Sequence, residues 1–200
     1  MRSDRILEIA RCAGGTVTSA ELIASGARWE DLYRLRDVGA LVELSRGVYR
    51  FVDSPATVHL DLVAVCRRAP GAMVCLNSAA SFWDLTDEMP DAVHIAVPRG
   101  AHRPQIAYPP TRVHTFTPGT FSLGRVEQQV ESEETITISS RERTVVDLMR
   151  LRSRVGRDVA LSALRRYLQG RDAKPGELLA LARQLRVGRA TADAMEPMLA

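Results

Sequence analysis

Histidine and cysteine are the first residue types to consider for chemistry, because their side chains bind metals and act as bases or nucleophiles. The histidines are His59, His94, His102 and His114, and the cysteines are Cys12, Cys66 and Cys75. No HExxH or CxxC pattern joins them, which favours structural histidines and buried, unreactive thiols over a zinc site. His94 and His114 fall on separate expected strands and could approach one another.

Motifs of common enzymes are absent. The chain has no GxxxxGK[ST] phosphate loop, no HRD or DFG element and no GxSxG turn. Pro90 and Asp91 resemble the start of a nuclease motif, but the strand that follows lacks the acid-x-lysine element, and Lys174 is the sole lysine. These absences disfavour an enzyme, and no catalytic residue, metal or cofactor is predicted.

The order of the expected elements near the N-terminus indicates nucleic-acid binding instead, although arginines and acids are equal in number there. An expected helix at residues 28–38 is followed by two short strand-like runs, 41–44 and 48–51, that form a hairpin. The helix would reach base edges or phosphates, and the hairpin would touch the DNA backbone or minor groove. The predicted DNA-contacting residues are Arg28, Tyr33, Arg34, Arg46 and Arg50.

A second polar cluster lies on a helix expected after a capping box at residues 139–142. Its apolar positions would be buried, and its polar positions would lie on the opposite face. That face is either simply solvated or a recognition surface for another macromolecule. The candidate partner residues are Arg141, Arg143, Asp147, Arg150 and Arg154.

A proline-rich loop at residues 98–110 carries Arg99, His102 and Arg103. A loop of this length in a compact domain is often functional, although a disordered connection is the alternative.

The elements that would position these residues begin with a helix after Ser3. A capping box at residues 18–21 then opens a short second helix, which is followed by the 28–38 helix and the hairpin. In the 28–38 helix, Trp29, Leu32, Leu35 and the stem of Arg36 share one face of the helical wheel. This order is typical of a winged helix-turn-helix. We therefore predict a DNA-binding domain at residues 1–54, with protein contacts as the alternative use of the module.

For the rest of the chain, residues 55–200, the sequence pattern predicts a domain that mixes helices and strands. Short strands are expected near residues 73–76, 92–97, 111–117, 125–130 and 133–138, and a helix at 57–68 precedes them. An antiparallel sheet is the economical arrangement of strands this close in sequence. Residues 55–140 form the α/β part, and 141–200 form basic helices. The predicted fold class is α+β: a winged helix-turn-helix, then a small antiparallel sheet and a C-terminal helical bundle.

The charge is unevenly distributed. The chain of 200 residues has a net charge of +3. Residues 1–54 hold eight arginines against eight acids, 56–140 hold six against nine, and 141–200 hold thirteen bases against seven acids. We expect the long-range attraction to DNA, or to an acidic face of a partner protein, to come from the C-terminal helices. The first residues lack the long apolar core of a signal peptide, and no apolar run approaches the length of about 20 residues that spans a membrane, so a cytoplasmic location without membrane contact is expected.

Several runs together resemble a known family. Residues 15–22 and 35–50, the latter with Arg-Gly-Val-Tyr at 46–49, resemble the N-terminal domain of AbiEi-type antitoxins of type IV (abortive infection) toxin–antitoxin systems. Residues 77–85, 94–99 and 140–148, with Arg-Thr-Val-Val-Asp-Leu at 143–148, resemble their C-terminal domain.

The resemblance implies a transcriptional autorepressor that binds its own promoter and neutralises a cognate toxin with a nucleotidyltransferase fold. Neutralisation need not involve a stable complex. The alternatives are an atypical serine protein kinase that inactivates the toxin by phosphorylation, and a stand-alone winged-helix regulator. For the kinase, arginines would bind phosphate, and Asp84, Asp87 or Asp147 would be the base or metal ligand.

Overall fold

The computed structural model describes residues 6, 8, 14–131 and 134–199, which form an α+β fold. The chain makes two compact units. The first contains the residues up to Gly71 together with 104–111 and 127–136, and the second contains 72–103, 112–126 and the residues from Thr137 onward. The predicted domains, residues 1–54 and 55–200, have other bounds than these compact units, and whether they fold independently stays a prediction. Ser3, Cys12 and most of the first expected helix lie outside the described residues.

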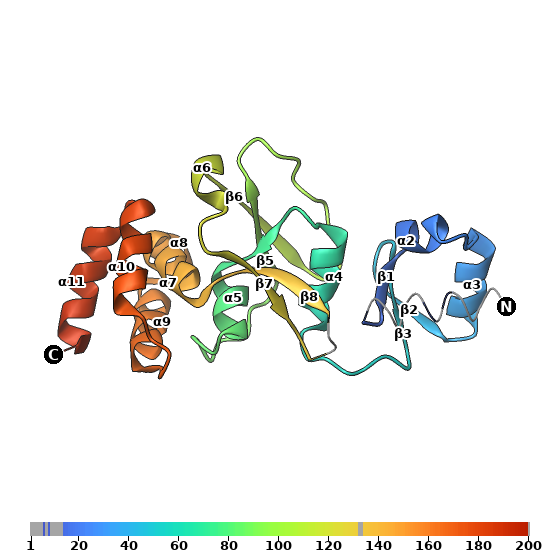
Figure 1. The fold of residues 1–200 in the computed structure, drawn as a ribbon, viewed down its shortest axis with the longest axis horizontal. Helices are drawn as coiled ribbons and strands as arrows, with labels where there is room; N and C mark the ends of the chain where they lie inside the picture. Colours follow the sequence, from blue (N-terminus) through green and yellow to red (C-terminus); the bar gives the residue numbers. More distant parts are fainter. Residues whose placement is uncertain (1–5, 7, 9–13, 132–133, 200) are drawn as a thin grey trace. The chain divides into compact units, whose positions relative to one another are not determined.

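In its described residues, the first unit carries a three-stranded antiparallel sheet together with helices (Figure 1). The elements in chain order are β1 (Thr16–Thr18), α2 (Ser19–Ala24), α3 (Trp29–Asp37), β2 (Leu41–Ser45), β3 (Val48–Phe51) and α4 (Leu60–Arg68). The strand order is β1-β3-β2, so Tyr49 pairs with Val17 on one side and with Glu43 on the other. The sheet, α2 and α3 enclose an apolar core, which includes Leu22 and Leu32, and α4 packs against the strands.

The start of α2 follows the predicted capping box. Thr18 Oγ1 accepts a hydrogen bond from the backbone N–H of Glu21 at 3.2 Å, and the Glu21 carboxylate accepts one from the Thr18 N–H at 2.7 Å. The two residues thus satisfy donors that the first helical turn leaves unpaired.

The second sheet has five strands in the order β6-β5-β4-β8-β7. They are β4 (Met73–Val74), β5 (Val93–Pro98), β6 (Thr111–Phe116), β7 (Arg125–Gln129) and β8 (Thr135–Ser139). β4 runs antiparallel to β5 but parallel to β8, with Val74 opposite Ile138. The expectation of a purely antiparallel sheet is therefore wrong. The expectation assumed that strands close in sequence pair with one another. β8 pairs with β4 although it lies more than sixty residues later in the chain, and it runs parallel to β4.

Helices supply most of the remaining structure. They are α5 (Leu76–Phe82), α6 (Pro118–Phe121), α7 (Arg141–Arg150), α8 (Arg152–Val155), α9 (Arg157–Gln169), α10 (Pro175–Gln184) and α11 (Gly188–Leu199). α7 contacts α5, α9 and α10, and α11 packs on α10 and α9 (Figure 1). Their shared core includes Cys75, Val145, Leu148, Leu164 and Leu178. The basic C-terminal helices are therefore part of the hydrophobic core of the second unit.

The N-cap of α7 is Ser140, one residue later than the predicted box. Ser140 Oγ accepts from the Arg143 N–H at 3.2 Å. The Ser139 hydroxyl instead lies 2.7 Å from the Thr144 hydroxyl inside the core.

Candidate functional site

The outer face of α3 is the first candidate surface. Only Leu32 and Leu35 of this helix are buried, while Trp29 and Tyr33 are each 50% exposed. The Trp29 and Tyr33 ring centroids are 6.5 Å apart, and the Arg36 guanidinium lies 5.1 Å from the Tyr33 centroid. Trp29 was expected to share one face with Leu32 and Leu35, but unlike those two buried residues it keeps half of its surface exposed. α3 thus presents aromatic and arginine side chains to solvent.

Asp31 has a local role at the start of α3. One of its carboxylate oxygens accepts from the Arg28 backbone N–H at 3.1 Å, and the other accepts from Arg34 Nη2 at 3.0 Å. The Asp31 side chain is 13% exposed and that of Arg34 is 58% exposed. A carboxylate in the first turn also interacts favourably with the helix dipole. The negative charge of Asp31 is therefore partly neutralised within α3, and Arg34 remains accessible.

The hairpin between β2 and β3 holds Arg46 at its tip. The Gly47 N–H donates to Glu43 Oε1 at 3.1 Å, and the Gly47 carbonyl accepts from the Ser19 N–H at 2.8 Å. Gly47 has φ +75, a conformation that suits glycine. These bonds fix the turn, and Arg46 is exposed beside it, as is Arg28 before α3. Glu43 thus accepts a hydrogen bond within its own hairpin, just as Asp31 accepts hydrogen bonds within its own helix.

Arg50 is not available as a hairpin contact, which corrects its predicted role. Its side chain is 9% exposed, and Nη1 donates to Glu134 Oε2 at 2.7 Å and to Thr16 Oγ1 at 2.8 Å. Nη2 donates to the Pro55 carbonyl. Glu134 Oε1 also accepts from the Thr16 N–H at 3.1 Å. All four residues of β3 are buried, so both faces of this strand are covered and the Arg50 side chain lies inside the unit.

Arg143 and Asp147 are also buried, so they are not a partner surface or a solvated face. Neither side chain has any exposed surface, and Arg143 Nε donates to Asp147 Oδ2 at 2.7 Å. Arg143 Nη1 donates to the backbone carbonyls of Thr120, at 2.9 Å, and Leu123. The segment around α6 covers this face of α7, which helical periodicity alone marks as polar and outward. Arg141 and Arg150 are partly exposed, and Arg154 is exposed.

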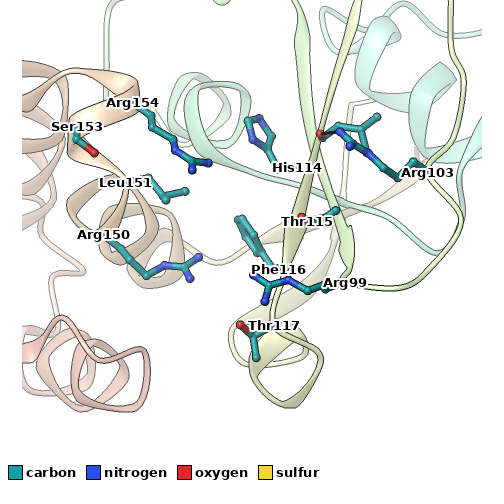
Figure 2. Close-up of a pocket in the computed structure, with 11 residues that line it drawn as sticks. Arg99, Arg103, His114, Thr115, Phe116, Thr117, Arg150, Leu151, Ser153 and Arg154 are labelled. Carbon is teal, nitrogen blue, oxygen red and sulfur yellow. Dashed lines mark hydrogen bonds between the residues drawn. The ribbon is translucent and has the colours of Figure 1, made fainter.

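A pocket of about 550 Å³ opens beside the end of α7 (Figure 2). We call it the arginine pocket, because four arginines line it. Its lining residues are Arg99, Arg103, Val113, His114, Thr115, Phe116, Thr117, Arg150, Leu151, Ser153 and Arg154. Figure 2 shows Arg99 and Arg150 pointing toward one another in front of Phe116, while Arg154 points toward His114.

Backbone and side-chain contacts hold these arginines in place. The Arg99 N–H donates to the Phe116 carbonyl at 2.8 Å, and Arg103 Nη2 donates to the Val113 carbonyl at 2.8 Å. The first residues of the proline-rich loop are thus fixed against β6. Arg150 Nη2 donates to Asp147 Oδ1 at 2.8 Å, and its guanidinium lies 4.9 Å from the Phe116 centroid.

His114 and His94 meet at the edge of the arginine pocket. His114 Nε2 lies 3.2 Å from His94 Nδ1, so one ring donates and the other accepts. Burial lowers the pKa of His94 to about 4, and the neighbouring His114 contributes. Burial also lowers the pKa of His114, helped by the positive charges of Arg112, Arg154 and Arg103. Both rings are therefore neutral at pH 7. Across the described part of the chain, no three His, Cys, Asp or Glu side chains gather in a way that could hold a metal ion.

The structure joins residues that sequence reasoning treated separately. Arg99 and Arg103 belong to the loop that was open to two interpretations, while Arg150 and Arg154 were assigned to a helix face. The hydroxyls of Thr115, Thr117 and Ser153 were missed, because single threonines and serines carry no motif. The carboxylates considered for a kinase lie elsewhere: Asp147 is behind Arg150, Asp87 pairs with Arg166, and Asp84 follows α5.

Comparisons with known proteins bear on the first unit and on the fold. Residues 4–52, about a quarter of the chain, match the family of transcriptional regulators described as AbiEi antitoxins. The resemblance to AbiEi-type antitoxins is confirmed over these residues. No curated protein matches the chain.

Among solved structures, the chain is similar to the RV2827C protein from Mycobacterium tuberculosis. The sequence identity is 18%, the TM-score is 0.51, and the match covers 91% of this chain and 80% of that one. This likeness concerns the fold alone. Among the described helices, none has both the length and the apolar character needed to cross a membrane.

Proposed function

We propose that this protein is a DNA-binding autorepressor and an antitoxin. The match of residues 4–52 to a family of antitoxin transcriptional regulators carries the proposal. That segment contains α3 and the β2–β3 hairpin, whose arginines Arg34 and Arg46 are exposed. In the proposed role, α2 and α3 form the helix-turn-helix and the hairpin forms the wing.

The DNA contacts are assigned from exposure. Arg34 on α3 would contact a base edge or a phosphate in the major groove, and Arg28 and Tyr33 would contact flanking phosphates. Arg46 at the hairpin tip would contact the backbone or the minor groove. Arg50 is excluded from the predicted set, because its guanidinium is held by Glu134. Asp31 orients Arg34 through their charge-assisted hydrogen bond.

The antitoxin half of the proposal concerns a toxin with a nucleotidyltransferase fold encoded beside this protein. The resemblance of residues 77–85, 94–99 and 140–148 to the C-terminal domain of the same antitoxins supports it. A stable complex is not required. The partner surface would include the exposed arginine Arg154 and the partly exposed Arg141 and Arg150, but not Arg143 or Asp147, which are buried.

A two-part experiment in cells tests this function. The protein is expressed beside a reporter driven by its own promoter, and separately together with the neighbouring toxin gene. We expect repression of the reporter and restored growth, and Arg34→Ala should relieve repression while leaving growth rescue intact. Repression without rescue would leave a stand-alone regulator, and the absence of both activities in the wild type would contradict the proposal.

A further inference from the structure

The arginine pocket has a separate chemistry from the proposed DNA-binding surface. All of its lining residues belong to the second unit, whereas α3 and the hairpin belong to the first. It is built by three segments: the start of the loop after β5, strand β6, and the end of α7 with α8.

The pocket has an excess of positive charge. None of its eleven lining residues, all of which lie in the described part of the chain, carries a carboxylate. Among the described residues, no carboxylate forms an ion pair with Arg99 or Arg154. Arg150 has Asp147, but that single carboxylate also neutralises Arg143. Four guanidinium groups around one cavity repel each other unless an anion lies between them.

The size of the pocket and its donors narrow the choice of anion. About 550 Å³ lies within the range of about 300 to 1,000 Å³ that is common for small-molecule sites. The hydroxyls of Thr115, Thr117 and Ser153 add hydrogen-bond donors to those of the arginines. The cavity therefore offers donors from several directions at once, which suits a compact ligand with many acceptor oxygens.

We propose that the arginine pocket binds an oligophosphate, a chain of two or more phosphate groups. Nucleoside di- and triphosphates and inorganic polyphosphates share this chemistry. Such chains carry several negative charges in a short length and accept paired hydrogen bonds from guanidinium groups. A DNA backbone carries one charge per phosphate along the outside of a wide helix, and its duplex does not fit inside a cavity.

His114 provides an internal reporter of this binding. It lies on the pocket wall beside His94 on β5, Arg103 on the loop, Arg112 on its own strand and Arg154 on α8. An anion placed between the arginines would stabilise the protonated imidazole and raise the pKa of His114.

The test uses the full chain and titrates it by calorimetry with inorganic tripolyphosphate, ATP and orthophosphate at physiological salt. We expect tripolyphosphate or ATP to bind at least about tenfold tighter than orthophosphate, and NMR to show a raised His114 pKa. The double variant Arg99→Gln/Arg154→Gln should bind at least about tenfold more weakly, because each guanidinium makes charge-assisted bonds. Both side chains are exposed, so folding should be retained.

The matched control is Arg157→Gln/Arg165→Gln, which removes the same charge from exposed positions on α9 outside the pocket. We expect this control variant to bind tripolyphosphate and ATP as the wild type does.

Tighter binding of ATP than of tripolyphosphate would identify the ligand as a nucleotide, and tighter binding of tripolyphosphate would identify it as an inorganic phosphate chain. The proposal is overturned if no oligophosphate binds better than orthophosphate, if both double variants are weakened equally, or if random duplex DNA displaces tripolyphosphate and raises the His114 pKa equally. None of these outcomes depends on promoter binding by α3.

Discussion

The Arg143–Asp147 pair shows how a charged residue can serve the core. Asp147 accepts from two arginines, and Arg143 also reaches the carbonyls of Thr120 and Leu123, so the pair attaches the α6 segment to α7. Gly124 is part of the same arrangement, since a Cβ there would lie 2.7 Å from the Arg143 Cβ. Removing one member leaves the other charge buried without its partner.

We therefore predict that Asp147→Ala lowers the free energy of unfolding by about 3–5 kcal/mol. Replacing both residues with apolar ones, as in Arg143→Met/Asp147→Leu, should cost less than the sum of the two single changes. The fully buried charge of Arg143 is then removed together with its partner, and Arg150, which also loses Asp147, is partly exposed to solvent. Urea denaturation of the wild type, the two single variants and the double variant measures this. Additive decreases in stability would show that the two side chains are not coupled.

His94 makes stability depend on pH. Its pKa in the folded protein is about 4, below the ordinary value of 6.5, because the ring is buried next to His114. The unfolded chain therefore takes up a proton first as the pH falls. The stabilising contribution is complete above pH 6.5 and disappears between pH 6.5 and about 4, and it amounts to at most about 3 kcal/mol.

We expect His94→Gln to reduce this dependence, so that its unfolding free energy changes less between about pH 7.5 and 4.5 than that of the wild type. Urea titrations at several pH values provide the comparison. Buried carboxylates also respond to acid, which is why the difference between the two proteins is the relevant quantity. Equal pH slopes for both proteins would contradict the role of His94.

Elements were predicted best where the local sequence contains its own start and stop signals. The capping box at Thr18, the glycine ends and the apolar spacing of Leu32 and Leu35 are all local, and α2 and α3 formed where they indicated. The direction of β4 against β8 was missed, because that pairing joins distant segments. The same reason explains Arg50 and Arg143: their partners Glu134 and Thr120 lie 84 and 23 residues away.

The arginine pocket could be predicted only in pieces. Arg99 and Arg103 were noticed in a long loop, and Arg150 and Arg154 on a helix, but no spacing rule relates the loop to the helix. Their convergence requires the loop to be fixed on β6 by the Arg99 N–H and the Arg103 guanidinium. Asp31 is the opposite case. It stands three residues after Arg28, the N-cap of α3, where an acidic side chain commonly accepts a hydrogen bond from the N-cap backbone N–H. This role could be predicted from the sequence.

At the scale of the whole molecule, the C-terminal helices carry the excess positive charge and also form part of the hydrophobic core. Residues 141–200 hold most of the excess positive charge, yet α7, α9 and α10 also supply much of the apolar core. Deleting this region would expose that core, so the contribution of its charge is better tested by substitution. We predict that changing the exposed arginines Arg157, Arg165, Arg171 and Arg189 to glutamine reduces the salt dependence of DNA binding.

The expected decrease in the slope of log affinity against log salt is up to about 0.9 for each phosphate that these arginines neutralise. Preference for the promoter sequence should be unchanged, because the proposed base contacts are on α3. An unchanged salt slope would assign the long-range attraction to DNA to another part of the protein.

The proposal that α3 reads promoter DNA is tested most directly by fluorescence anisotropy of the full chain. A duplex from its own promoter and a scrambled duplex of equal length are titrated over a series of salt concentrations. We predict tighter binding to the promoter, and an affinity for it that is about tenfold or more weaker in Arg34→Ala. Arg68→Ala, which removes an exposed arginine from α4, should change little. Equal affinity for the two duplexes, or equal weakening in the two variants, would contradict the proposal.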